Sequence, residues 1–430
     1  MPKITHRGLV FLILCFIFIF VLFFRTNTAV IVEDLMAEFA IPAVSLGLMA
    51  SAFFYAYGAV QIPVGFLADR ISVRHTVFCL GLLGVGGCIV FAFSTGLPMA
   101  TWARVLMGIG TAGVWIPSLK YIAISYSPDK FATMTGIINA VGGQGLILAT
   151  FPMAMMAERI GWRLSYIIPS LVMLTLLIVL YHLMKSSSTR SSQIQGGNKA
   201  QEEQNKGEQQ KKPSSSPDYS FWRHPMFWRF ALWAFLVYGV LFSFQSLWGA
   251  SYLQESFGKS REFAGILLMF ISIGGICGGV VWGLLSERFF RARRPVLLLG
   301  TIGMAGAWTA LLFFSSYPGA FVIALIYFLL GFCGFTFLLN LGCVKEFFPL
   351  EIAGTAMGTV NASMFIGVAA FQGITGYIID RFGGDPLTPY RAIFCLYLGS
   401  VILASIIVSI MPETFPKTLQ TGDKIAKEKK

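Results

Sequence analysis

The chain has 430 residues, of which 56% are hydrophobic and only 12% are charged, and its mean hydropathy is +0.72. This composition excludes a soluble globular protein of that size and predicts an all-α protein whose solvent is the lipid bilayer. The net charge of +12 does not indicate nucleic-acid binding, because the basic residues concentrate in short connections between apolar runs.

Apolar runs of about 20 residues, the length needed to cross a bilayer, recur along the whole chain. The first run has no small-residue cleavage site after it, so we expect a retained spanning helix and not a signal peptide. The uncharged stretch 295–344 is long enough for two spans, which the sequence SSYPG would divide by a turn. The pattern predicts twelve transmembrane helices, at residues 8–36, 43–68, 74–94, 98–124, 131–157, 162–184, 227–254, 262–286, 295–315, 318–346, 352–379 and 389–411.

A polar, low-complexity segment at residues 185–226 divides the spans into two groups of six. It cannot bury a core, so it predicts a disordered linker. The expected domains are an N-terminal six-helix bundle at 1–184, this linker, a C-terminal six-helix bundle at 227–411 and a tail at 412–430.

Basic clusters fall on alternate connections, at residues 1–7, 70–75, 288–294 and in the tail. The positive-inside rule places such connections in the cytoplasm. We therefore expect a multi-pass protein of a bacterial-type cytoplasmic (inner) membrane, with the linker and both termini cytoplasmic. We also expect a monomer surrounded by membrane lipids.

Two sequence pairs recur at nearly the same separation: GFLADRISVRH from Gly65 with GLLSERFFRARR from Gly283, and TGIINA around Asn139 with MGTVNA around Asn361. Repeats of this kind indicate that the two halves are a duplicated unit. The first motif resembles the loop between helices 2 and 3 of the major facilitator superfamily. The resemblance spans essentially the whole chain and implies two six-helix bundles around a central cavity, which is exposed alternately to each side.

The motif and its second copy are candidate gate elements. A glycine permits close helix approach, and an aspartate at a helix end can accept hydrogen bonds from a facing helix N-terminus. Alternatively, the basic residues only anchor the loop to lipid head groups. The candidate gate residues are Gly65, Asp69, Arg70, Arg74, Glu287 and Arg288.

Arg25 lies inside the first span, with no charged residue between Arg7 and Arg25. A buried arginine at that depth is costly unless it faces protein or water. The sequence FFRTNTAV resembles helix 1 of organophosphate:phosphate antiporters, in which the corresponding arginine binds the substrate anion. Those proteins carry a second arginine in helix 7, and LFSFQSLWG here has none, which favours a monocarboxylate or zwitterion over a phosphate ester. A carbonyl or cross-helix partner for Arg25 is the alternative.

Arg104, in WARVLMGIGTAG, resembles the arginine of the superfamily's helix 4 pattern. The resemblance implies a part in coupling substrate movement to proton movement. Snorkelling to the interface, or bonding to carbonyls of the first helix, is the alternative.

Several polar or amphipathic side chains inside spans are candidate substrate contacts beside Arg25. Hydrogen bonding between helices is their alternative role. The resemblance implies that helices 1, 2, 5 and 7 line the cavity, which favours a role in substrate binding for the candidates on these helices. The candidates are Gln61, Asn139, Gln245, Trp248 and Asn361.

No sequence motif indicates a nucleotide loop, a catalytic triad or a metal site, so neither an enzyme nor a cofactor is expected. Helix 5 lacks the Gly-Pro dipeptide of proton-driven drug antiporters, and KEFFPLEIAGTAMGTVN resembles solute-uptake members. The sequence therefore predicts a secondary transporter of a small organic anion or amino acid, with a proton or sodium ion as candidate coupling ion. A drug or metabolite exporter and a transporter-like membrane sensor are the alternatives.

Overall fold

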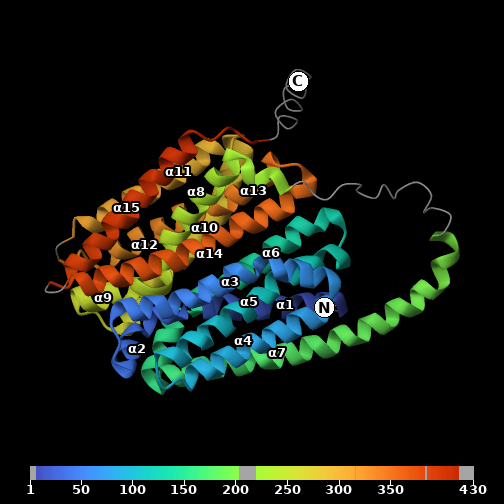
Figure 1. The fold of residues 1–430 in the computed structure, drawn as a ribbon, viewed down its shortest axis with the longest axis horizontal. Coiled ribbons are helices and arrows are strands. Elements are labelled where there is room, and N and C mark those ends of the chain that lie inside the picture. Colours follow the sequence, from blue (N-terminus) through green and yellow to red (C-terminus); the bar gives the residue numbers. More distant parts are fainter. Residues whose placement is uncertain (1–5, 203–218, 315, 383–384, 416–430) are drawn as a thin grey trace.

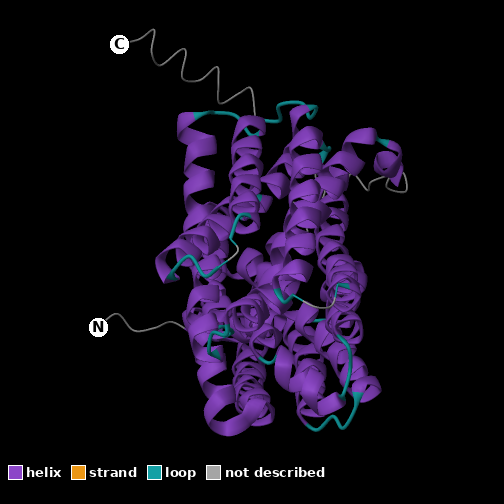
Figure 2. Ribbon diagram, turned by 90° about the vertical axis from the view of Figure 1, so that its left-hand side faces the viewer, coloured by secondary structure: helices purple, strands orange, loops and turns teal. Residues whose placement is uncertain are grey.

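The computed structural model describes residues 6–202, 219–314, 316–382 and 385–415. These residues form helices joined by short loops, and none of them forms a strand (Figure 2). The N-terminal half contains α1 (His6–Thr26), η1 (Asn27–Val30), α2 (Val32–Phe39), α3 (Ala43–Arg70), α4 (Val73–Ala92), α5 (Leu97–Ser125), α6 (Pro128–Leu148) and α7 (Phe151–Glu202). The C-terminal half contains η2 (Tyr219–Arg223), α8 (Pro225–Ser243), η3 (Phe244–Trp248), α9 (Gly249–Phe257), α10 (Arg261–Leu284), η4 (Leu285–Phe289), α11 (Arg294–Leu312), α12 (Ala320–Gly334), α13 (Phe337–Phe347), α14 (Leu350–Arg381) and α15 (Leu387–Ser409).

Within the described residues, 11 helical segments are long and apolar enough to cross a membrane. One of them, α7, contains a break at Gly161, whose φ of 81° is strained for any residue with a side chain. Residues 151–160 therefore extend the span begun by α6, and the rest of α7 forms the next span. With this division the twelve-span fold predicted from the sequence is confirmed.

One expectation about the linker differs from the structure. Helix α7 continues to Glu202, so residues 185–202 are helical and not disordered. Extending an existing helix avoids the cost of nucleation, which explains how a polar sequence can continue a buried span. The remaining linker residues at 203–218 lie outside the described part of the chain.

The two halves form separate groups of helices, with the N-terminal half below and the C-terminal half above in Figure 1. Helix α3 of one half runs along α14 of the other. A side chain at Gly47 would place its Cβ 2.4 Å from the Gln372 carbonyl oxygen, and one at Gly376 would place it 2.6 Å from the Ala43 carbonyl oxygen. Glycine at these two positions therefore allows the halves to approach closely.

Candidate functional site: a cavity between the two halves

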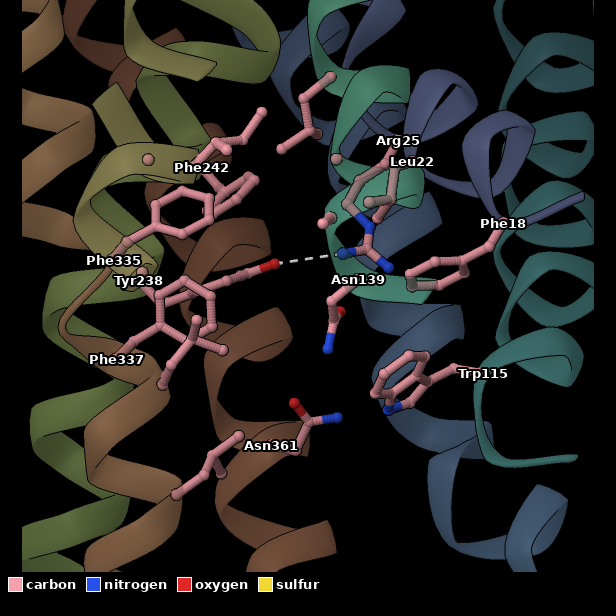
Figure 3. Close-up of a pocket in the computed structure, with 18 of the residues that line it drawn as sticks. Phe18, Leu22, Arg25, Trp115, Asn139, Tyr238, Phe242, Phe335, Phe337 and Asn361 are labelled. Carbon is pink, nitrogen blue, oxygen red and sulfur yellow. Dashed lines mark hydrogen bonds between the residues drawn. The ribbon is translucent and has the colours of Figure 1, made fainter. Parts of the chain in front are cut away.

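A cavity of about 360 Å³ lies between the halves. Its walls come from α1, α3, α5 and α6 on one side and from α8, α10, α13 and α14 on the other (Figure 3). Glycines in α6 and α10, including Gly143 and Gly279, contribute wall without side-chain volume. This volume lies at the lower end of the range of about 300–1,000 Å³ that is usual for small-molecule sites.

Arg25 lies at the C-terminal end of α1 and faces this cavity (Figure 3). Its Nη1 donates a hydrogen bond to Tyr238 Oη of the other half at 3.4 Å. The guanidinium also lies over the rings of Tyr57 and Phe365, at 4.9 Å and 5.0 Å from their centroids. Its Nε is buried without a hydrogen-bond partner, and no described acidic side chain forms an ion pair with it. Arg25 therefore keeps hydrogen-bonding capacity for a ligand.

Two amide side chains lie farther along the same cavity. Asn139 of α6 and Asn361 of α14 project into it from opposite halves, near the indole of Trp115 (Figure 3). An amide offers both donors and an acceptor. Of the described lining residues, Arg25 is the single charged one, so the cavity is positive and suits an anion whose other end is polar.

The other three candidate contacts do not line this cavity. Gln61 is 3% exposed, and its Nε2 has no hydrogen-bond partner. Gln245 donates to Ser272 Oγ at 2.9 Å, and Trp248 donates to Thr375 Oγ1 at 2.7 Å. Both belong to the π-helix η3, whose extra residue in the turn changes which side chains face the cavity. They hold α8 and α9 to neighbouring helices of the C-terminal half.

The sequence did not single out several aromatic residues that line the cavity. Tyr238 accepts the hydrogen bond from Arg25, Phe365 lies beside the guanidinium, and Trp115 packs on Phe18 with ring centroids 4.9 Å apart. Phe365 lies four residues after Asn361, so helical spacing could have placed both on one face. Among the many aromatic residues of this chain, that spacing is a weak signal.

The first copy of the gate motif lies at the end of α3. The surroundings of Gly65 and the side chain of Asp69 are outside the described part of the structure. Arg70 is exposed at the helix end. Arg74 lies over the ring of Tyr181 at 3.7 Å, within its own half.

The second copy belongs to a charged cluster in the C-terminal half. Glu287 lies in η4, with its Oε1 3.9 Å from Arg293 Nη2, and Arg293 Nη2 in turn lies 2.8 Å from Glu346 Oε1. Burial lowers the pKa of Arg293, but the hydrogen bonds that Arg293 donates to Glu346, together with the negative charges of Glu346 and Glu287, raise this pKa overall. Arg288 is exposed. This cluster ties the connection between α10 and α11 to the end of α13.

At the opposite end of the bundle, charged side chains join the two halves. Asp380, at the end of α14, accepts hydrogen bonds from the backbone N–H groups of Ala43 at 2.9 Å and Val44 at 2.7 Å, which are the first residues of α3. Arg261 of α10 forms an ion pair with Asp34 of α2 at 2.9 Å. The sequence alone does not predict this contact of Asp380, because the contact depends on how α14 meets α3.

Arg104 lies outside the cavity, in the interior of the N-terminal half. It is 1% exposed and lies over the rings of Phe53 at 4.9 Å and Phe91 at 6.0 Å. Its Nε and Nη1 have no hydrogen-bond partner. Arg104 therefore does not snorkel to the interface in this structure.

Comparisons with known proteins agree with this architecture. Residues 14–292 and 246–429 match the family described as Major Facilitator Superfamily. A Cupriavidus necator protein described as a probable sulfoacetate transporter is 26% identical over 421 residues, which cover 95% of each chain. The glycerol-3-phosphate transporter of Bacillus subtilis is 25% identical over 390 residues, which cover 85% of this chain and 83% of the relative.

The crystal structure of a D-xylose-proton symporter superposes with a TM-score of 0.72 at 16% sequence identity, covering 95% of this chain and 99% of that chain. This likeness shows the fold of two six-helix bundles. The match to the family model over residues 14–292 and 246–429 confirms the resemblance noted in the sequence, and the chain belongs to the Major Facilitator Superfamily.

Proposed function

We propose that this protein is a secondary transporter that carries a small organic anion through the cavity between its halves by alternating access. The observation that carries the proposal is Arg25, a buried guanidinium on the cavity wall with an unpartnered Nε. A buried charge without a counter-ion is costly. A substrate carboxylate or sulfonate would supply that counter-ion and accept charge-assisted hydrogen bonds.

An amino acid fits this cavity less well than an anion does. Its ammonium group would need an acceptor, and the described lining residues include no carboxylate. Asn139 and Asn361 could instead bind a hydroxyl or a second polar group of an anionic substrate. The names of two relatives, which refer to sulfoacetate and glycerol-3-phosphate, support a small organic anion.

Alternating access gives the charged contacts between the halves a role. Asp380 and Arg261 hold the halves together at the end opposite the N-terminus, and these contacts would open when the protein exposes the cavity to that side. Asp69 would close the other end in that state. Coupling to a proton or sodium ion, and a cytoplasmic location of both termini, are parts of the same proposal.

Uptake into liposomes tests the proposal. Liposomes that contain the purified protein should accumulate labelled sulfoacetate, or a related carboxylate, more than alanine or xylose. Comparing uptake under an imposed proton gradient and an imposed sodium gradient should identify the coupling ion. Specific binding of the anion without any uptake would favour the sensor alternative. Equal uptake of anionic, zwitterionic and neutral solutes would contradict the assignment of an anion.

A further inference from the structure

A second buried guanidinium, that of Arg104, lies in the N-terminal half and does not line the cavity. Arg104 Nε and Nη1 have no hydrogen-bond partner, and neither has Nδ2 of Asn27, a side chain that is 0% exposed. An arginine cannot lose its charge in a protein. These three buried donor atoms, two on the Arg104 guanidinium and one on the Asn27 amide, therefore require an acceptor.

The protein groups around these donors do not supply one. Tyr166 donates its hydroxyl proton to Asn27 Oδ1 at 2.9 Å, and its oxygen lies 3.2 Å from Thr28 Oγ1. Tyr166 and Cys88 are the ionisable side chains that interact with Arg104, and both are neutral at physiological pH, so neither supplies a negative charge. No described carboxylate pairs with Arg104.

The rings connect these groups into one cluster. The Arg104 guanidinium lies 6.0 Å from the centroid of the Phe91 ring, and Phe91 lies 4.8 Å from Tyr166. Asn27 begins the 3-10 turn η1, where the first span is no longer α-helical. Breaks of this kind in transporter helices are places where ions bind.

We propose that Arg104 and Asn27 bind a small inorganic anion of the size of chloride. The anion would accept hydrogen bonds from Arg104 Nε and Nη1 and from Asn27 Nδ2, and it would neutralise the buried guanidinium. The site is distinct from the substrate cavity, because neither Arg104 nor Asn27 is among the described residues that line the cavity.

The two sites are joined through one aromatic pair. Phe53 and Tyr57 of α3 stack with centroids 6.1 Å apart; Arg104 lies over Phe53 and Arg25 lies over Tyr57. Occupancy of the anion site would therefore support the packing behind Arg25.

The experiment measures the thermal unfolding midpoint of purified Arg25→Gln protein. This substitution removes the main anion-binding group of the substrate cavity, so that a response to chloride reports on the second site. Sodium chloride is compared with sodium methanesulfonate at equal sodium concentration. Chloride should raise the midpoint in a saturable manner, and Arg104→Gln should abolish this response or raise the half-saturating chloride concentration by more than about tenfold, the change that corresponds to losing one charge-assisted hydrogen bond.

Asn27→Asp keeps the shape and supplies an internal carboxylate, so it should make stability independent of chloride even if Arg104→Gln does not fold. Asn139→Asp adds the same charge in the cavity and should leave the chloride response intact. A midpoint in the Arg25→Gln protein that does not respond to chloride would mean that water fills the site. That result, or an unchanged response in Asn27→Asp, would overturn the proposal.

Discussion

Arg25 and Tyr238 face each other across the cavity, with Arg25 Nη1 3.4 Å from Tyr238 Oη, and they connect the two halves of the protein. This distance is long for an N–H···O bond, so an anion can replace the phenol as the partner of Arg25. Binding of a substrate would thereby exchange a contact between the halves for contacts with the ligand.

Tyr238→Phe removes the hydroxyl and keeps the ring. The phenol shares Arg25 with the ligand only through a long hydrogen bond, so we expect ligand affinity to change by no more than about tenfold, which is about 1.4 kcal/mol. Titration calorimetry with the transported anion measures the change. A loss as large as that caused by Arg25→Gln would show that Tyr238 itself is a principal ligand contact.

Asp380→Asn should weaken the closure at the end of the bundle where α14 meets α3. The substitution removes the negative charge that two backbone N–H groups of α3 share, and a helix cap of this kind contributes about 0.5–2 kcal/mol. Spin labels at Ala40 and Lys259 should report a larger population of long distances between the halves.

Asp385→Asn is the matched control for that experiment. Asp385 bonds to Leu387 and Thr388 in its own half, so its loss should leave the distance distribution unchanged. Equal effects of the two substitutions would contradict a specific role for Asp380 in closure.

Asp69→Asn should lower the transport rate more than it lowers ligand affinity. The substitution removes charge with little change in volume, and a gate acts on the change of conformation while the ligand contacts stay the same. Uptake into liposomes and equilibrium binding measure the two effects separately. Transport by Asp69→Asn protein at the unmodified rate would rule out a necessary gate function.

Cysteines introduced at Ser191 and Thr418 should resist membrane-impermeant reagents in intact cells, because the positive-inside rule places the linker and the tail in the cytoplasm. A cysteine at Ala40, at the opposite end of the bundle, is the positive control and should react. Labelling of Ser191→Cys or Thr418→Cys from outside would reverse the orientation.

Some of the candidate site could be predicted because an isolated charge in an apolar run is a strong signal. Arg25 stands out in that way, and the repeat places Asn139 and Asn361 at corresponding positions of the two halves. The sequence could not predict that the side chains of Gln245 and Trp248 lie outside the cavity, because their direction depends on the π-helix at Phe244–Trp248.

Contacts between segments that are far apart in the chain also could not be predicted from the sequence. The bond from Ala43 to Asp380 joins residues far apart in the chain, and it exists because glycines let α3 and α14 come together. The twelve spans, in contrast, follow from local hydrophobicity, since an isolated helix in a bilayer must satisfy its own backbone hydrogen bonds.

The central claim is that Arg25 binds the negative group of the substrate, and the affinity of Arg25→Gln for sulfoacetate or a related carboxylate tests it most directly. Charge-assisted hydrogen bonds contribute about 1.5–3 kcal/mol, so affinity should fall by roughly tenfold to more than a hundredfold. Arg25→Lys should recover part of the loss, because it restores the charge without the planar fork. A folded Arg25→Gln protein that binds the anion with unchanged affinity would contradict the claim.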